Sequence, residues 1–147
     1  AQILDLMRAM SRRGNTAVIL ITHDLGVIAE MAARVAVMYA GHIVEQASVE
    51  TLFDRPLHPY TQGLIASVPT PGQPKDHLDA IPGTVPDLLN MPPGCRFAAR
   101  CTARVEYKLE ICSEREPDLI EMGPGHQVRC YLYQSHGEHR APLSEAA

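Results

Sequence analysis

The stretch TAVILIT, residues 16–22, decides the fold of this 147-residue chain, because it is an aliphatic run closed by a threonine at each end. Such a run is typical of a strand buried on both faces, as in a parallel sheet. Apolar residues recur at helical spacing over residues 2–13, and Gly14 follows them as a stop. Asp24 is placed to cap a second helix over about residues 25–33. Helix, buried strand and helix predict an α/β fold.

A hairpin is predicted after the second helix, with strands over residues 34–39 and 42–47. Ala40-Gly41 lies between the two strands, and glycine permits the tight turn that a hairpin needs. Ser48 is placed to cap a short helix over residues 49–54.

Proline divides the chain, with two prolines before residue 69 and ten after it. Pro59 is well placed to begin a helix that runs to about residue 68. Because proline removes a donor and fixes φ, we expect turns, short elements and extended segments over residues 69–147.

The composition is that of an ordinary globular chain, with 46% hydrophobic and 20% charged residues, which argues against wholesale disorder. No apolar run approaches about 18 residues, so no membrane-spanning helix is expected. The net charge of -4 argues against a nucleic-acid binder, which is usually basic. The chain opens on Ala1 inside a predicted helix and shows no secretory signal, so we expect it to begin in the middle of a domain.

His23 is the first candidate site residue, because it follows the predicted strand by one residue. In α/β sheets, ligands gather beyond the carboxyl ends of the strands. A capping or loop histidine is the alternative interpretation, since position in a fold does not establish function.

Cys95, Cys101, Cys112 and Cys130, below called the four cysteines, are separated by five, ten and seventeen residues. Thiolates favour soft metals, namely zinc or an iron–sulfur cluster. The paired spacing of zinc sites and the familiar ferredoxin spacings are both absent, so the spacing leaves zinc, a cluster and free thiols open.

The surroundings of the four cysteines suit a ligated site. Gly94 permits a close approach of the backbone before the first cysteine, and His126 is a weaker candidate ligand. We expect four apolar residues to shield the site from water: Phe97, Val105, Leu109 and Ile111. Three arginines flank cysteines and either lower the thiol pKa values or are ordinary surface residues: Arg96, Arg100 and Arg129.

The segment LITHDLGV, residues 20–27, resembles the switch-histidine segment of ATP-binding cassette ATPases. The segment RVAVMYAGHIVE, residues 34–45, resembles the hairpin that normally follows it in that family. The preceding helix, the tetrapeptide ITHD at residues 21–24 and the hairpin occur in the family's order and spacing, which makes the resemblance specific.

The segment LHPYTQGL, residues 57–64, resembles the start of the C-terminal extension of oligopeptide and dipeptide importer ATPases. IPGTVP at residues 81–86 and the four cysteines continue the same pattern, so the resemblance covers about residues 1–132. The spacing between Cys101 and Cys112 is longer than is usual in the family, which predicts a longer loop or a helical turn between them.

The resemblance implies that His23 contacts the γ-phosphate region of ATP, bound with Mg²⁺ mainly by other residues, and helps to place the attacking water. Such positioning suits phosphoryl transfer, which depends mostly on geometry and on charge stabilisation. The sequence contains no Gly-x-x-x-x-Gly-Lys-Ser/Thr loop, so this chain alone is expected to lack the ATPase activity of its parent protein. The resemblance also places a 4Fe–4S cluster on the four cysteines, with zinc as the lesser alternative.

The expected organisation has three parts. Residues 1–57 form the C-terminal part of a P-loop nucleotide-binding domain of α/β class, residues 58–132 form an irregular, proline-rich extension with the four-cysteine site, and residues 133–147 form a disordered tail.

The implied function is that of an ATP-hydrolysing, energy-coupling subunit of an importer for peptides or related solutes, peripheral on the cytoplasmic face of the membrane. Its implied partners are membrane permease subunits, a second ATPase subunit, identical or paralogous, and indirectly a solute-binding protein, with no nucleic acid. A stand-alone metal-binding interaction module without ATPase activity is the alternative.

Overall fold

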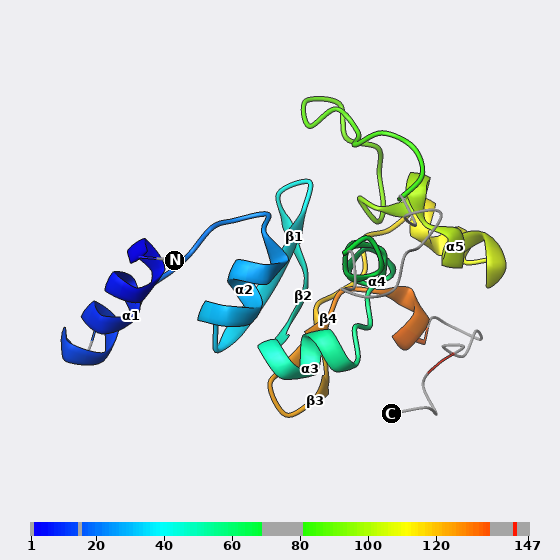
Figure 1. The fold of residues 1–147 in the computed structure, drawn as a ribbon. Coiled ribbons are helices and arrows are strands. Elements are labelled where there is room, and N and C mark those ends of the chain that lie inside the picture. Colours follow the sequence, from blue (N-terminus) through cyan, green and yellow to red (C-terminus); the bar gives the residue numbers. More distant parts are fainter. Residues whose placement is uncertain (1, 15, 69–80, 136–142, 144–147) are drawn as a thin grey trace.

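The computed structural model describes residues 2–14, 16–68, 81–135 and 143 (Figure 1). In chain order its helices and strands are α1 (Gln2–Gly14), α2 (Leu25–Met31), β1 (Arg34–Tyr39), β2 (His42–Ser48), α3 (Val49–Asp54), α4 (Pro59–Ala66), the 3-10 helix η1 (Ala98–Arg100), α5 (Thr102–Glu106), the 3-10 helix η2 (Glu110–Ser113), β3 (Ile120–Gly123), β4 (His126–Val128) and the 3-10 helix η3 (Tyr131–Tyr133). Most of the tail expected over residues 133–147 lies outside the described residues.

The predicted hairpin is confirmed: β1 and β2 pair antiparallel from Arg34 opposite Ser48 to Tyr39 opposite His42. The turn is made by Ala40 with φ 46° and Gly41 with φ 85°. Positive φ at both central residues is the geometry of the hairpin turn that matches the natural twist of the strands.

Two strands from far along the chain complete the sheet, whose order is β1-β2-β4-β3. β4 pairs antiparallel with β2, placing Val128 opposite Glu45, and the backbone N–H of Arg129 donates to the carbonyl of Val44 at 2.8 Å. The sequence predicts no strand this late in the chain. The two strands span four and three residues, which is too short for an alternating pattern to be visible.

The prediction of a buried strand over residues 16–22 is wrong for this structure. The segment is extended but unpaired, and the side chains of Ile19 and Ile21 are 91% and 95% exposed. A strand needs a neighbour to bond with, and the described residues place none beside it. The fold is therefore mixed α/β as predicted, but its sheet is antiparallel instead of parallel.

The predicted helix starts are confirmed by their caps. Asp24 caps α2, Ser48 caps α3 by accepting from the N–H of Thr51, and Pro59 stands in the first turn of α4. The N-cap of α4 is His58, whose ring nitrogen accepts from the N–H of Tyr60 at 3.0 Å.

The core consists of two small clusters. The first is aromatic: Tyr39, Val44 and Phe97 are buried, and the ring of Tyr60 packs against those of Tyr39 and Phe97 at centroid distances of 4.7 and 5.5 Å. The second gathers around Val128, Cys130 and Leu132. Both clusters combine segments far apart in the sequence: the first joins the hairpin to Phe97, and the second joins Leu57 to residues beyond position 102.

Within the part of the chain that the structure describes, no helix has the length and apolar character needed to cross a membrane.

Candidate functional site

His23 lies in the bend between the extended segment and α2, and its side chain is exposed. The next residue, Asp24, is the N-cap of α2, so the histidine stands immediately before the start of a helix. An exposed imidazole in this place is free to donate to a phosphate oxygen or to orient a water.

The four cysteines are carried by separate short elements and are all free thiols. Cys95 precedes η1, Cys101 is the N-cap of α5, Cys112 lies in η2, and Cys130 follows β4. The predicted helical turn between Cys101 and Cys112 is present as α5.

The four thiols influence one another electrostatically. Burial raises the pKa of every one of them, and that of Cys112 rises to about 12. Mutual repulsion adds to this effect, because Cys95 and Cys101 each raise the pKa of Cys112, and all three raise that of Cys130. The thiols are therefore neutral at pH 7, and converting them to thiolates requires a compensating positive charge.

Backbone groups also face the sulfur atoms. The N–H of Arg104 donates to Sγ of Cys101 at 3.4 Å, and hydrogen bonds from the backbone of Phe97 and of Leu132 act on Cys95 and Cys130. Such bonds stabilise the ionised form of a thiol, which is the form that binds metals.

Among the described residues, no group of three or more His, Cys, Asp or Glu side chains could hold a metal ion. The structure therefore singles out neither zinc nor an iron–sulfur cluster.

The prediction that apolar residues shield the four cysteines from water is only partly correct. Phe97 is 3% exposed and packs beside Cys95 and Cys101, whereas Val105 is 75% exposed and contributes no shield.

The three arginines predicted to flank the cysteines are partly exposed and donate to backbone carbonyls. Arg96 donates to the carbonyl of Ala40, Arg100 to those of Ile81 and Pro82, and Arg129 to those of Ile43 and Pro117. The guanidinium that lowers the pKa of Cys101 and Cys112 belongs to Arg104.

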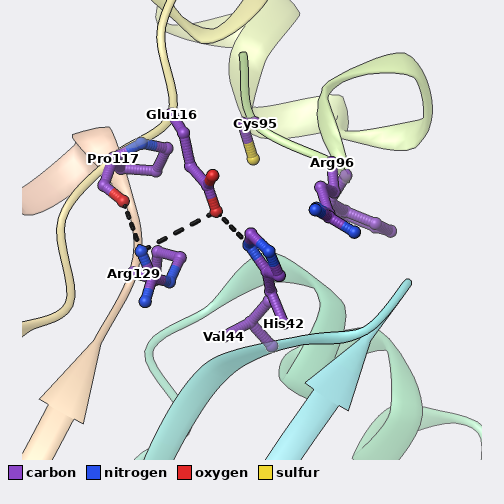
Figure 2. A pocket seen from close by; sticks show the side chains of 8 residues that line it. His42, Val44, Cys95, Arg96, Glu116, Pro117 and Arg129 are labelled. Atoms are coloured by element: carbon purple, nitrogen blue, oxygen red, sulfur yellow. Dashed lines mark hydrogen bonds and ion pairs between the residues drawn. The ribbon is translucent and has the colours of Figure 1, made fainter. Parts of the chain in front are cut away.

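The hairpin meets the segment that carries the four cysteines, residues 94–130 and below called the cysteine segment, at a charged junction (Figure 2). Glu116 pairs with Nδ1 of His42 and lies 3.7 Å from Nη1 of Arg129, and Cys95 lines the same small cavity. This cavity measures about 10 Å³, no more than one water occupies, so the junction joins segments and does not hold a larger ligand.

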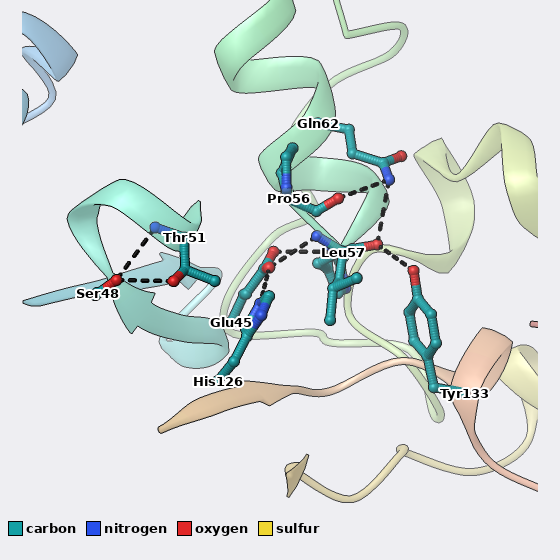
Figure 3. A network of polar contacts seen from close by, with 9 residues as sticks. Glu45, Ser48, Thr51, Pro56, Leu57, Gln62, His126 and Tyr133 are labelled. Atoms are coloured by element: carbon teal, nitrogen blue, oxygen red, sulfur yellow. Dashed lines mark hydrogen bonds and ion pairs between the residues drawn. The ribbon is translucent and has the colours of Figure 1, made fainter. Parts of the chain in front are cut away.

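A second junction is centred on a buried glutamate and is not predicted from the sequence (Figure 3). Glu45, 0% exposed, accepts hydrogen bonds from the N–H groups of Leu57 and His58 at 2.8 and 2.9 Å and pairs with Nε2 of His126 at 2.8 Å. We call these four residues the Glu45 network. His126 is thus engaged away from the four cysteines. No sequence signal marks Glu45, because a glutamate in a short strand normally faces solvent.

Replacing Gly94 with alanine is expected to destabilise the cysteine segment by about 3 kcal/mol. Gly94 has φ +85°, and a Cβ there would lie 2.3 Å from the carbonyl oxygen of Cys112, which itself accepts the N–H of Cys95 at 2.8 Å. Urea unfolding followed by hydrogen exchange over residues 94–113 measures the loss.

The matched control is Gly125→Ala. Gly125 has φ +71° but no neighbouring heavy atom within 4 Å of its Cβ position, so only the backbone strain of about 1–2 kcal/mol is expected. Equal losses in the two variants would show that the contact with Cys112 is unimportant.

Burial of His58 predicts a pH dependence of stability. Desolvation lowers its pKa from 6.5 to about 3. Between these values the unfolded chain binds a proton that the folded chain does not, so stability falls as the pH is lowered from 6.5 towards 3. The slope contributed is at most about 1.4 kcal/mol per pH unit. Thermal unfolding at several pH values should show this slope in the original protein and lose it in His58→Asn, which keeps a capping acceptor. An unchanged slope in the variant would assign the effect to another group.

Comparison with known proteins identifies related sequences. Residues 44–107 match the family described as the oligopeptide/dipeptide transporter, C-terminal region. The chain is 48% identical over 137 residues to the oligopeptide transport ATP-binding protein AppD of Bacillus subtilis, covering 93% of this chain and 40% of that protein. It is also 48% identical to OppD of the same organism, covering 90% of this chain and 36% of OppD, and to the dipeptide transport ATP-binding protein DppD of Lactococcus lactis, covering 90% and 37%. The chain thus spans about 40% or less of these relatives.

Proposed function

We propose that this chain is part of an ATP-binding and ATP-hydrolysing subunit that drives an importer for peptides or related solutes. The observation that carries the proposal is the 48% identity, over nine tenths of the chain, to ATP-binding proteins of oligopeptide and dipeptide transport. The match of residues 44–107 to the C-terminal region of such transporters supports the same assignment.

His23 is the residue of this chain that acts on ATP. Its exposed imidazole, at the start of a helix, contacts the γ-phosphate region and orients the attacking water. ATP and its Mg²⁺ are held mainly by residues of the whole protein outside this sequence, because a phosphate loop is not among the 147 residues.

The subunit works at the cytoplasmic face of the membrane, against permease subunits and beside a second ATP-binding subunit. A solute-binding protein delivers the solute. Residues 1–57 belong to the nucleotide-binding domain, and residues 58–132 form the extension.

The test is ATP hydrolysis by the whole protein, reconstituted with its permease subunits in lipid vesicles. Hydrolysis is expected to rise when solute-loaded binding protein is added, and residues 1–147 alone are expected to show none. A whole protein that neither binds nor hydrolyses ATP, yet retains metal, would instead support the stand-alone metal-binding module.

We propose in addition that the four cysteines hold one 4Fe–4S cluster, which would staple residues 95–130 and offset the charge of the thiolates. Three observations support this: the thiols are close enough to raise each other's pKa, backbone N–H groups face their sulfur atoms, and Phe97 covers the site. Four thiolates match the four iron corners of such a cluster.

Protein purified without oxygen is therefore expected to contain about four iron and four sulfide per chain and to absorb visible light. Cys130→Ser should weaken or abolish the cluster and speed hydrogen exchange over residues 93–132, while disturbing ATP hydrolysis less than loss of His23 does. Ser113→Ala, beside Cys112, is the control and should keep the colour.

Two outcomes would contradict the cluster. A colourless protein that holds one zinc would establish the zinc site, and a metal-free protein whose four thiols all react freely would exclude both metals.

A further inference from the structure

The two residues that flank His23 both use their side chains to fix the local backbone. Oγ1 of Thr22 accepts the N–H of Asp24 at 3.0 Å. Oδ1 of Asp24 accepts the N–H groups of Gly26 and Val27 at 2.9 and 3.1 Å. The bend that carries His23 is therefore tied on both sides by hydrogen bonds.

The bend is also hydrogen-bonded to the first turn of α2. The carbonyl of Asp24 accepts the N–H of Ile28 at 3.1 Å, which is the first helical bond of α2, and the backbone of Asp24 is extended with φ -89° and ψ 103°. The direction in which residue 23 leaves the backbone thus depends on where α2 begins.

Space around the Asp24 carboxylate is limited. A Cβ on residue 26 would lie 3.2 Å from Oδ1 of Asp24, closer than side chains normally approach. The small residue at position 26 leaves room for the carboxylate to reach both of its N–H groups.

We propose that Thr22 and Asp24 are positioning residues for His23, which set the direction of its imidazole without touching the nucleotide. This inference rests on the proposed role of His23 in ATP hydrolysis. A displacement of about 1 Å in a group that places a reacting atom lowers turnover by as much as about 100-fold, while ground-state binding is affected much less.

The expected result in the whole protein is a fall in kcat of about 10- to 100-fold for Asp24→Ala, with KM for ATP changed less than about threefold. Asp24→Asn and Asp24→Ser keep a capping oxygen and should restore most of the lost turnover. Thr22→Val keeps the shape but removes the acceptor, and should lower kcat about three- to tenfold.

Ser48→Ala is the matched control for simple loss of a helix cap. Ser48 caps α3 through the N–H of Thr51 at 3.1 Å, as Asp24 caps α2, but it lies outside the bend that carries His23. Its removal should leave kcat unchanged. An equal fall in kcat for Ser48→Ala and Asp24→Ala would overturn the proposal, because cap loss alone would then explain both.

A double variant separates positioning from an independent effect. If Asp24 acts through His23, adding Asp24→Ala to His23→Ala should not lower kcat further. A further fall of about tenfold would overturn the proposal, as would normal turnover in both Asp24→Ala and Thr22→Val while His23→Ala is impaired. Near-normal turnover of His23→Ala itself would instead remove the catalytic assignment of His23, a different failure. If Asp24→Ala does not fold, Thr22→Val can replace it in this test, measured alone and together with His23→Ala.

Discussion

Replacing His23 with alanine is expected to lower ATP hydrolysis by the whole protein at least about 100-fold, while the Kd for ATP changes less than about threefold. The reason is that an imidazole which orients the attacking water contributes in the transition state and little to the bound ground state. The exposed position of His23 at the start of α2 leaves its ring available for this contact. Single-turnover hydrolysis together with equilibrium binding of a labelled nucleotide separates the two effects.

His42→Ala is the control, since His42 is a second histidine that pairs with Glu116 at the junction of the hairpin and the cysteine segment. This variant should hydrolyse ATP at a rate near that of the original protein. Near-normal turnover in His23→Ala, or a loss in kcat no larger than that of His42→Ala, would show that His23 is not the switch residue.

Replacing Glu45 with alanine is expected to cost about 3–5 kcal/mol of stability. The change leaves two backbone N–H groups, on Leu57 and His58, and the ring of His126 without their acceptor inside the protein, and it opens a cavity. Amide hydrogen exchange in the whole protein should become fast at Leu57, at His58 and along β4, since the network holds all three segments to β2.

Gln46→Ala provides the matched control, because Gln46 also bridges β2 and β4 through its amide, to Gln127, but is only partly buried. Its loss should cost no more than about 1 kcal/mol. If amide exchange along β4 is equally slow in Glu45→Ala and Gln46→Ala, the strand pairing alone holds β4 to β2 and the Glu45 network is dispensable.

The parts of the fold that the sequence predicts are those set by neighbours along the chain. The hairpin turn at Ala40-Gly41 and the caps at Asp24 and Ser48 depend on residues at most a few positions apart, and all are present. Local rules of this kind need no knowledge of the partner segments.

Features that depend on distant partners could not be predicted in the same way. β4 pairs with β2, and Glu45 meets His126, across 81 positions of sequence. Residues 16–22 show the opposite case, in which an aliphatic pattern predicts burial but no partner strand lies beside it in the described residues.

The candidate site divides along the same line. The need for Gly94 follows from its residue type. A common site on the four cysteines is expected only from a resemblance, and it stays a proposal. The carbonyl contacts of Arg96, Arg100 and Arg129 depend on which backbone segments lie opposite them, and residue type alone does not predict those segments.

Because the protein is synthesised from its N-terminus, β2 is made well before the strand β4 with which it pairs. The ribosome completes β2 about 80 residues before it makes β4, an interval of about 4–16 s at 5–20 residues per second. During that interval the edge of β2 that later receives β4 has no partner from this pair, and the carboxylate of Glu45 has not yet met His126. The nascent hairpin therefore has one open strand edge for seconds before β4 can pair with it.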